Sequence, residues 1–317
     1  MSMKRTFIAL TGGIGGAKLA LGMAGILPAA RLTAVVNTGD DFEHLGLHIC
    51  PDIDTLIYTL AGIGNPETGW GRANESWSFM SALDELGAET WFRLGDKDLA
   101  LNVYRSHRLR SGQTLSEVTA DLAKRLGLAV AVVPMSDDPV ATHVDTDSGL
   151  LEFQEYFVRR RCEPVVSAIH FKGSESARMA PGFAKLLRGT ELTAIIICPS
   201  NPFLSIDPIL SIPGVKTSLS NCPAPVIAVS PLVGGKAIKG PTAKIMGELG
   251  VPVAASAVAE HYKGLIDGFV LDSSDARFAD SIADRGLKVK VTNTVMQTLD
   301  DRISLARDVL EFAVSLR

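Results

Sequence analysis

The chain has 317 residues, of which 46% are hydrophobic, so it can bury a sizeable core as one large or two ordinary domains. Its net charge of −4 and sequence pI near 5.9 exclude a broad basic face for nucleic acid. The apolar run at Thr6 is short and ends in glycines, so we expect no signal peptide, and no apolar run is long enough to span a membrane. The four cysteines are scattered, which indicates a reduced, cytoplasmic protein without disulfides or a zinc site.

A glycine-rich turn follows the first predicted strand, Thr6–Leu10, and an apolar helical pattern follows the turn. Such a strand, turn and helix bring backbone N–H groups together around a phosphate, and Lys18 adds a cation. The dinucleotide-binding pattern needs glycine or alanine where Lys18 stands, and the P-loop needs serine or threonine where Leu19 stands. A tight turn without a ligand is the alternative. The candidate phosphate-binding residues are Gly12, Gly13, Gly15 and Lys18.

Apolar runs that are typical of buried strands recur along the chain, with longer periodic segments between them. This alternation predicts an α/β fold, a Rossmann-like doubly wound and mostly parallel sheet with helices on both faces. In such sheets ligands bind beyond the carboxyl ends of the strands. The six further predicted strands are Leu32–Val36, Leu128–Val133, Thr193–Cys198, Val226–Val229, Gly268–Leu271 and Leu287–Val291.

The gap between the second and third predicted strands is too long for one crossover. We therefore expect residues 56–126 to form a helical insertion that covers the active site, and residues 1–55 and 127–317 to form the core. The expected helices of the insertion are Glu75–Leu86, Lys97–Arg110 and a third that Thr114 and Glu117 begin with a capping box.

Two later segments carry clear patterns. Glu152–Arg160 alternates in polarity, which predicts an extended arm or an edge strand. Val295–Arg317 is strongly amphipathic and predicts a helix. Its apolar stripe is consistent with a homodimer or with packing on the sheet.

Four aspartates follow the second predicted strand, in the segments Asn37–Asp41 and Pro51–Thr55. Single aspartates there could cap helices, but the cluster as a whole favours Mg²⁺ held opposite the phosphate loop, with one carboxylate free to orient or deprotonate a hydroxyl. His44 and His48 stand four apart, which suits a metal pair but is more typical of exposed or core histidines. The candidates are Asp40, Asp52 and Asp54 for the metal, Asp52 and Asp54 for catalysis, and Asn37 and Thr38 for substrate.

Three further loops carry candidate residues. Ser200 and Asn201 follow the fourth strand, where they can contact a ligand, cap a helix, or do both. The loop 230–241 combines two glycines with lysines, which indicates an anion-binding site; a solvated turn that happens to contain lysines is the alternative. At its end, Gly240 and Pro241 are typical of the N-cap and first residue of a helix. The segment 91–98 places aromatics beside charges, which suits either a planar heterocycle or an aromatic core. The candidates here are Gly234, Gly235, Lys236 and Lys239 from the second loop and Arg93 and Lys97 from the third.

Together these motifs resemble the 2-phospho-L-lactate transferase family, and the similarity runs over nearly the whole chain. It rests on TGGIGGAKL, NTGDD, CPDIDT, WFRLGDKD, PSNP and SPLVGGKAIKGP, the last being the most specific.

The resemblance implies a reaction. The donor is a guanosine diphosphate ester of 2-phospholactate, or of phosphoenolpyruvate in many bacteria, and the acceptor is the deazaflavin Fo, the precursor of coenzyme F-420. The ribityl hydroxyl of Fo attacks the phosphorus that carries the three-carbon acid, GMP leaves, and Mg²⁺ is required. The family also implies that Asp54 of the PDIDT segment and a basic residue of the insertion, Arg93 or Lys97, contact the deazaflavin.

Two other functions compete with this one. A nucleotide-sugar-binding regulatory protein resembling the gluconeogenesis factor would share the glycine loop, but the intact PDIDT and WFRLGDKD segments favour the transferase. An NAD-dependent oxidoreductase would need G-x-G-x-x-G and an acidic residue at the end of the second strand, where Asn37 stands.

Overall fold

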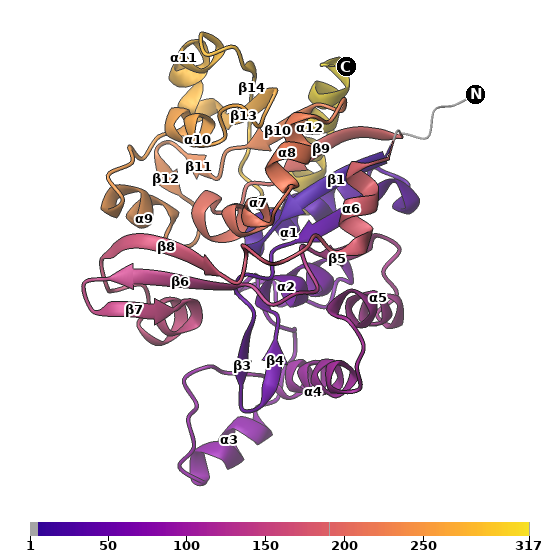
Figure 1. Ribbon diagram of the computed structural model, residues 1–317, viewed down its shortest axis with the longest axis vertical. Helices are drawn as coiled ribbons and strands as arrows, with labels where there is room; N and C mark the ends of the chain where they lie inside the picture. The colour runs from indigo at the N-terminus through magenta and orange to yellow at the C-terminus, as the bar shows by residue number, and fades with distance from the viewer. Residues whose placement is uncertain (1–5, 190, 317) are drawn as a thin grey trace.

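A seven-stranded parallel sheet forms the centre of the protein in the computed structural model, which describes residues 6–189 and 191–316 (Figure 1). The strand order is β14-β13-β10-β9-β1-β2-β5, and every neighbouring pair is parallel. All seven predicted strands are present, and the α/β prediction is confirmed. Their bounds are β1 Thr6–Thr11, β2 Leu32–Val36, β5 Ala131–Pro134, β9 Leu192–Ile197, β10 Val226–Val229, β13 Gly268–Asp272 and β14 Lys288–Thr292.

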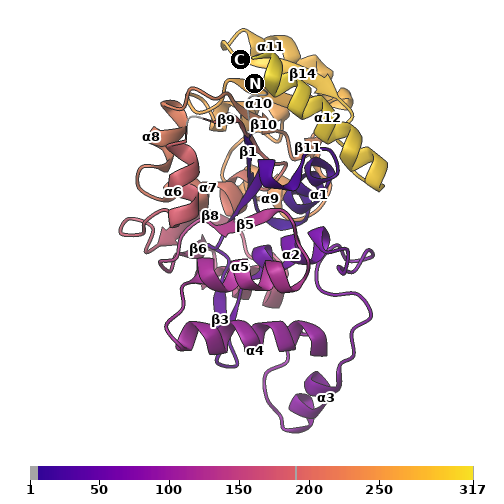
Figure 2. The ribbon, with the colours of Figure 1, turned by 90° about the vertical axis from the view of Figure 1, so that its right-hand side faces the viewer.

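Helices cover both faces of this sheet because side chains alternate along each strand. On β1, Ile8 and Leu10 pack on one face, and Phe7 and Ala9 pack on the other. α1 and α12 cover the second face, while α6, α7 and α8 lie on the first (Figure 2). The helix bounds are α1 Gly13–Ala24, α6 Pro181–Leu187, α7 Asp207–Ser211, α8 Val215–Ser220, α10 Ala255–His261, α11 Ala279–Ala283 and α12 Leu299–Ser315, with short turns η1 Ala29–Arg31, η3 Pro202–Ile206 and η4 Ser273–Phe278.

The chain order places a switch point between β1 and β9. From β1 the chain runs outward to β2 and β5, and it then returns to β9 and runs outward in the opposite direction to β14. The loops after β1 and β9 therefore diverge at the carboxyl edge of the sheet, which leaves a crevice where ligands bind in folds of this type.

The segment between β2 and β5 contains a hairpin and four helices. The helices predicted at 75–86 and 97–110 are confirmed as α3 and α4, and the capping box of Thr114 and Glu117 begins α5. α3 lies farthest from the sheet in both views (Figure 1, Figure 2). The bounds are β3 Phe42–His44, β4 Leu47–Ile49, α2 Pro51–Leu60, α3 Ser78–Glu85, α4 Asp96–Arg110 and α5 Leu115–Arg125.

A separate antiparallel sheet, in the order β7-β6-β8, was not predicted. The predicted extended arm at 152–160 is wrong beyond Glu152, because the π-helical turn η2 spans Glu155–Arg159. Phe153 and Tyr156 stand three apart and are both buried, so the apparent alternation is helical spacing. The bounds are β6 Ala141–Thr146, β7 Gly149–Glu152 and β8 Val166–Lys172.

Two helix starts differ from their predictions. The C-terminal helix begins at Leu299, where Thr298 and Asp301 form a capping box, and Arg317 of the prediction lies outside the described residues. Its apolar side chains pack on α1 and the sheet, so this stripe gives no support for a homodimer. α9, Thr242–Glu248, has Pro241 as its N-cap rather than its first residue. Within the described part of the chain, no helix is both long and apolar enough to cross a membrane.

Candidate active site

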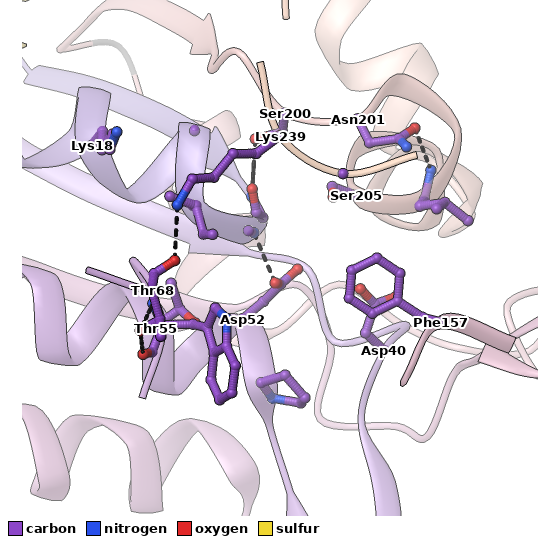
Figure 3. A pocket seen from close by; sticks show the side chains of 18 of the residues that line it. Lys18, Asp40, Asp52, Thr55, Thr68, Phe157, Ser200, Asn201, Ser205 and Lys239 are labelled. Carbon is purple, nitrogen blue, oxygen red and sulfur yellow. Dashed lines mark hydrogen bonds between the residues drawn. The ribbon is translucent and has the colours of Figure 1, made fainter. Parts of the chain in front are cut away.

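A cavity of about 840 Å³ lies at the switch point (Figure 3). Its walls come from the loops after β1, β9, β10 and β14, from α2, and from the segment between α2 and α4. Of the predicted site residues, the cavity is lined by Gly12, Gly13, Gly15, Lys18, Asp40, Asp52, Asp54, Arg93, Ser200, Asn201 and Lys239.

The glycine loop is fastened to two neighbouring segments. Gly13 donates its N–H to Asp52 Oδ1 at 2.7 Å, and Gly12 donates to Ser200 Oγ at 3.3 Å. A Cβ on Gly15 would stand 2.2 Å from the carbonyl oxygen of Pro199. Two of the amides expected to face a phosphate therefore hold the loop in place, and Gly15, in the first turn of α1, is left to face the cavity.

Asp40 and Asp52 form the acidic wall of the cavity, and both are buried. Burial raises the pKa of Asp52 to about 6, although hydrogen bonds from Asn37 and Gly13 oppose that rise. Burial and the charge of Asp52 also raise the pKa of Asp40. Asp40 Oδ1 is buried without a hydrogen-bond donor among the described residues. Two buried carboxylates that face the same cavity, one with an unsatisfied oxygen, fit Mg²⁺, which prefers oxygen ligands.

Asp54 has a different environment. Arg105 donates Nη1–H to Asp54 Oδ2 at 3.1 Å and Nη2–H to Asp54 Oδ1, so both carboxylate oxygens are occupied. Burial raises the pKa of Asp54, and the guanidinium of Arg105 opposes this. The geometry thus makes Asp54 a weaker metal ligand than Asp40 or Asp52.

Sequence reasoning missed Arg105. Its side chain is fully buried, and Nη1 also donates to Asn102 Oδ1 at 2.6 Å. The signal was present in the periodicity of α4, since Leu101 and Arg105 stand four apart on the same helical face.

Asn37 and Thr38 are buried but do not line the cavity. Asn37 instead positions a neighbour, because its Nδ2 donates to Asp52 Oδ2 at 2.9 Å while its Oδ1 accepts from the Gly39 N–H at 2.8 Å. Asn37 thus supports Asp52, and its role as a direct substrate contact stays a prediction.

Lys18 and Lys239 both line the cavity (Figure 3). Lys18 Nζ donates to the carbonyl of Met296 at 2.9 Å, and Lys239 Nζ donates to the carbonyl of Thr68 at 2.9 Å. Burial lowers the pKa of Lys18, and the positive charges of Arg302 and Lys239 lower it further. These two ammonium groups supply the cavity with positive charge for an anion.

The other lysine-loop candidates lie outside the cavity lining. Gly234 and Gly235 form the two-residue turn of the hairpin β11–β12, Leu232–Val233 and Lys236–Ala237, with φ of 58° and 71°. Such a turn needs positive φ at both positions, so the turn itself explains the glycines. Lys236 is exposed at the start of β12.

Ser200 and Asn201 both line the cavity, and Asn201 is also a cap. Asn201 Oδ1 accepts the N–H groups of Phe203 and Leu204, as a residue that begins a helical turn does. Its Nδ2 is buried without a hydrogen-bond acceptor among the described residues. The capping role expected of this loop is therefore confirmed, and its contact with a ligand stays a prediction.

The segment 91–98 divides between the cavity and the core. Phe92 and Arg93 line the cavity, and the Arg93 guanidinium lies 4.5 Å from the ring centre of Trp77. Trp91 packs edge-on against His44, so His44 is a core histidine. Lys97 donates to the carbonyl of Asn74 at 2.5 Å and does not line the cavity, which favours Arg93 as the basic residue facing a ligand.

A family model described as 2-phospho-L-lactate transferase CofD matches residues 7–305. The chain belongs to this family. A phosphoenolpyruvate transferase of Streptomyces griseus is 38% identical over 98% of this chain and 99% of its own length. A 2-phospho-L-lactate transferase of Methanocaldococcus jannaschii is 37% identical over 97% of this chain and 98% of its own length.

The 2-phospho-L-lactate transferase family is a family of transferase enzymes, so the transferase prediction is supported. A crystal structure of a UPF0052 family protein from Bacillus halodurans shares the fold, with a TM-score of 0.62 over 98% of this chain and 99% of that chain. Its sequence identity is 14%, so the likeness concerns the fold alone.

Further residues of the site escaped sequence reasoning. The arm around η2 and the loop after β14 supply one wall each, and neither was expected to reach the cavity. The loop after β14 did carry a signal, since polar residues follow a predicted strand there, as they do after the other strands. These lining residues are Phe153, Gln154, Phe157, Val158, Thr294, Val295, Met296 and Gln297.

Proposed function

We propose that this enzyme transfers a 2-phospholactyl or phosphoenolpyruvyl group from its guanosine diphosphate ester to the ribityl hydroxyl of Fo, with release of GMP, in coenzyme F-420 biosynthesis. The donor would be lactyl- or enolpyruvyl-2-diphospho-5′-guanosine. One observation carries the proposal within the family: the Asp40–Asp52 pair, two lysines and an aromatic wall share one cavity.

The anionic donor fits between the glycine loop and the lysines. The first turn of α1, which includes Gly15, carries a partial positive charge, and Lys18 and Lys239 add two full charges. Both ammonium groups now donate to backbone carbonyls, so they can exchange these neutral acceptors for phosphate oxygens.

Asp40 and Asp52 would hold Mg²⁺ against the donor diphosphate. The bound ion would offset negative charge on the phosphoryl oxygens during transfer. Asn37 and Gly13 keep Asp52 in place through their hydrogen bonds, so the Asp52 carboxylate would need little movement when the transition state forms.

The acceptor fits the wall formed by the insertion. Phe92, Trp70 and Tyr58 offer aromatic surface to a planar ring, and Arg93 offers a cation beside it. Asp54, held by Arg105, would accept a hydrogen bond from the ribityl hydroxyl and orient it.

In the transfer, the hydroxyl oxygen forms a bond to phosphorus and the bond from phosphorus to the GMP oxygen breaks. The hydroxyl proton leaves to Asp54, which would already accept the hydrogen bond of that hydroxyl, while Asp52 would stay ionised as a ligand of Mg²⁺.

Fluorescence titration with Fo tests the proposal directly. We expect saturable binding that weakens by at least about fivefold in Trp70→Ala, since stacking contributes roughly 1–3 kcal/mol. Leu86→Ala is the control, because Leu86 is exposed and outside the cavity lining. If Fo does not bind, with or without Mg²⁺, the proposed acceptor is wrong.

A further inference from the structure

A second group of metal-binding side chains lies beside the cavity but does not belong to the Asp40–Asp52 pair. Asp41, His48 and Cys50 place one carboxylate oxygen, one imidazole nitrogen and one sulfur within 4.8 Å of one another. We call these residues the Asp41–His48–Cys50 cluster. The sequence analysis expected no zinc site, because the chain has no C-x-x-C pattern; these three side chains come together through strand pairing instead.

The β3–β4 hairpin brings the three side chains together. Phe42 pairs with Ile49, so the next register position sets Asp41 opposite Cys50. His48 stands two residues before Cys50, and side chains two apart on a strand point to the same face. The cluster is therefore fixed by backbone geometry at the open end of the hairpin.

The carboxylate of Asp41 lacks the partners that burial demands. Its side chain is 7% exposed, and no donor among the described residues hydrogen-bonds either of its oxygens. His48 Nε2 is likewise buried without a hydrogen-bond partner, and it stands 3.5 Å from Asp41 Oδ2. A buried carboxylate with no donor costs several kcal/mol unless a cation offsets its charge.

The spacing suits two ligands of one tetrahedral ion. Zinc bonds to oxygen and nitrogen are about 2.0–2.1 Å, so two such ligands at a tetrahedral angle lie roughly 3.3–3.4 Å apart. The observed 3.5 Å between Asp41 Oδ2 and His48 Nε2 is close to this value and longer than a good hydrogen bond.

The local charges are also consistent with a divalent ion. Asp54 and Arg105 neutralise each other, so the Arg105 charge is already paired, and the ion-pair partner of Asp41 is His48 at 3.5 Å, which offsets the Asp41 charge only when it is protonated. Metal coordination deprotonates a thiol, and a divalent ion with one thiolate adds a single positive charge, which balances Asp41.

We propose that Asp41, His48 and Cys50 bind one Zn²⁺ and that water from the His48 side completes the tetrahedron. The mixed nitrogen, oxygen and sulfur donors select zinc over magnesium, which takes oxygen ligands. His48 is 31% exposed, so water and the ion enter past it, whereas Cys50 is fully buried. The ion would fasten the hairpin to the start of α2, next to Asp40 and Asp52.

Metal titration of the chelator-treated full chain tests this, with excess Mg²⁺ present throughout. We expect one Zn²⁺ per chain, and with Co²⁺ as a probe a thiolate-to-cobalt charge-transfer absorption. Cys50→Ser should abolish that absorption and weaken Zn²⁺ binding at least about a hundredfold, since losing even an outer-shell partner costs 10–100-fold. Cys222→Ser, a half-buried cysteine outside the cluster, should change neither.

If Cys50→Ser does not fold, His48→Gln serves as the second variant. His48 is partly exposed, so its substitution should leave the fold intact. It should weaken Zn²⁺ binding by a similar factor while circular dichroism stays native. Absence of stoichiometric Zn²⁺ in the wild type would overturn the proposal. So would a cobalt–thiolate absorption that survives Cys50→Ser, or one that Cys222→Ser removes.

Discussion

The fully buried guanidinium of Arg105 fixes the position and charge of Asp54 although Arg105 itself does not line the cavity. It occupies both oxygens of Asp54 and is held in turn by Asn102. The PDIDT segment was visible in the sequence, but its aspartates have unequal partners. Asp52 is bound by neutral N–H donors and Asp54 by a charged one, a difference that only the contact with α4 creates.

Removal of Arg105 should destabilise the fold. In Arg105→Met the Asp54 carboxylate is left buried without its charge partner, and we expect a loss of about 3–5 kcal/mol in the free energy of unfolding. Chemical denaturation measures it, and Asp54→Asn in the same chain should restore part of the loss. Arg125→Met, which breaks the exposed pair with Asp121, should cost under about 1 kcal/mol. Equal losses in the two single variants would refute this reading.

Asp52→Asn should keep the fold and lose turnover. The amide oxygen can still accept from Gly13, but it carries no charge for Mg²⁺, whose electrostatic contribution of several kcal/mol corresponds to at least about a hundredfold in kcat. Steady-state kinetics over a range of Mg²⁺ concentrations measures this, with the exposed Asp284→Asn as control. Turnover within a few-fold of the wild type would remove Asp52 from the proposed metal site.

At the scale of elements, the parallel strands could be predicted and the antiparallel ones could not. Buried parallel strands are continuous apolar runs such as Val226–Val229, which stand out in a sequence. β3, β4, β11 and β12 have two or three residues each and are defined by their turns. The prediction of an extended arm at η2 was wrong because, over a few positions, apolar residues spaced three apart and apolar residues spaced two apart give similar patterns.

The glycine loop illustrates the same limit for a site. Its strand–turn–helix form could be predicted, but the direction of its amides could not. Two of them bind Asp52 and Ser200, residues 39 and 188 positions away in the chain. Contacts that join distant loops leave no periodic signal in a local sequence.

Gly15→Ala should disrupt the junction of the loops after β1 and β9. Its Cβ would meet the Pro199 carbonyl oxygen at 2.2 Å, and a backbone atom cannot move aside as a side chain can. We expect a loss of about 1–3 kcal/mol in the free energy of unfolding, as for an overpacked core, together with weaker donor binding. Gly247→Ala in α9, with open space around its Cβ, should instead stabilise the protein by about 0.5–1 kcal/mol. Thermal denaturation separates the two, and a neutral Gly15→Ala would contradict the packing described.

For the whole molecule, the buried carboxylates that line the cavity should make the free energy of unfolding depend on pH. The pKa of Asp52 is about 6 and that of Asp40 is also raised, so both bind protons more tightly when the chain is folded. Folding stability should therefore rise as pH falls from 7.5 through 6 toward 5, where the buried charges are relieved.

Mg²⁺ should reverse that dependence, because it binds the ionised carboxylates and must displace their protons. Thermal denaturation with and without Mg²⁺ should show a stabilisation that is small at pH 5 and larger at pH 7.5. Asp52→Asn should lose most of the difference. A stabilisation by Mg²⁺ that is the same at both pH values would contradict the assignment of the ion to these aspartates.

Product analysis tests the proposed transfer to Fo. The purified enzyme is incubated with Fo, Mg²⁺ and either lactyl- or enolpyruvyl-2-diphospho-5′-guanosine, and the products are identified by mass. We predict that at least one donor gives the Fo phosphodiester together with an equal amount of GMP, and that Asp52→Asn forms neither at a comparable rate. Formation of no Fo adduct from either donor, by an enzyme that binds Fo, would contradict the account.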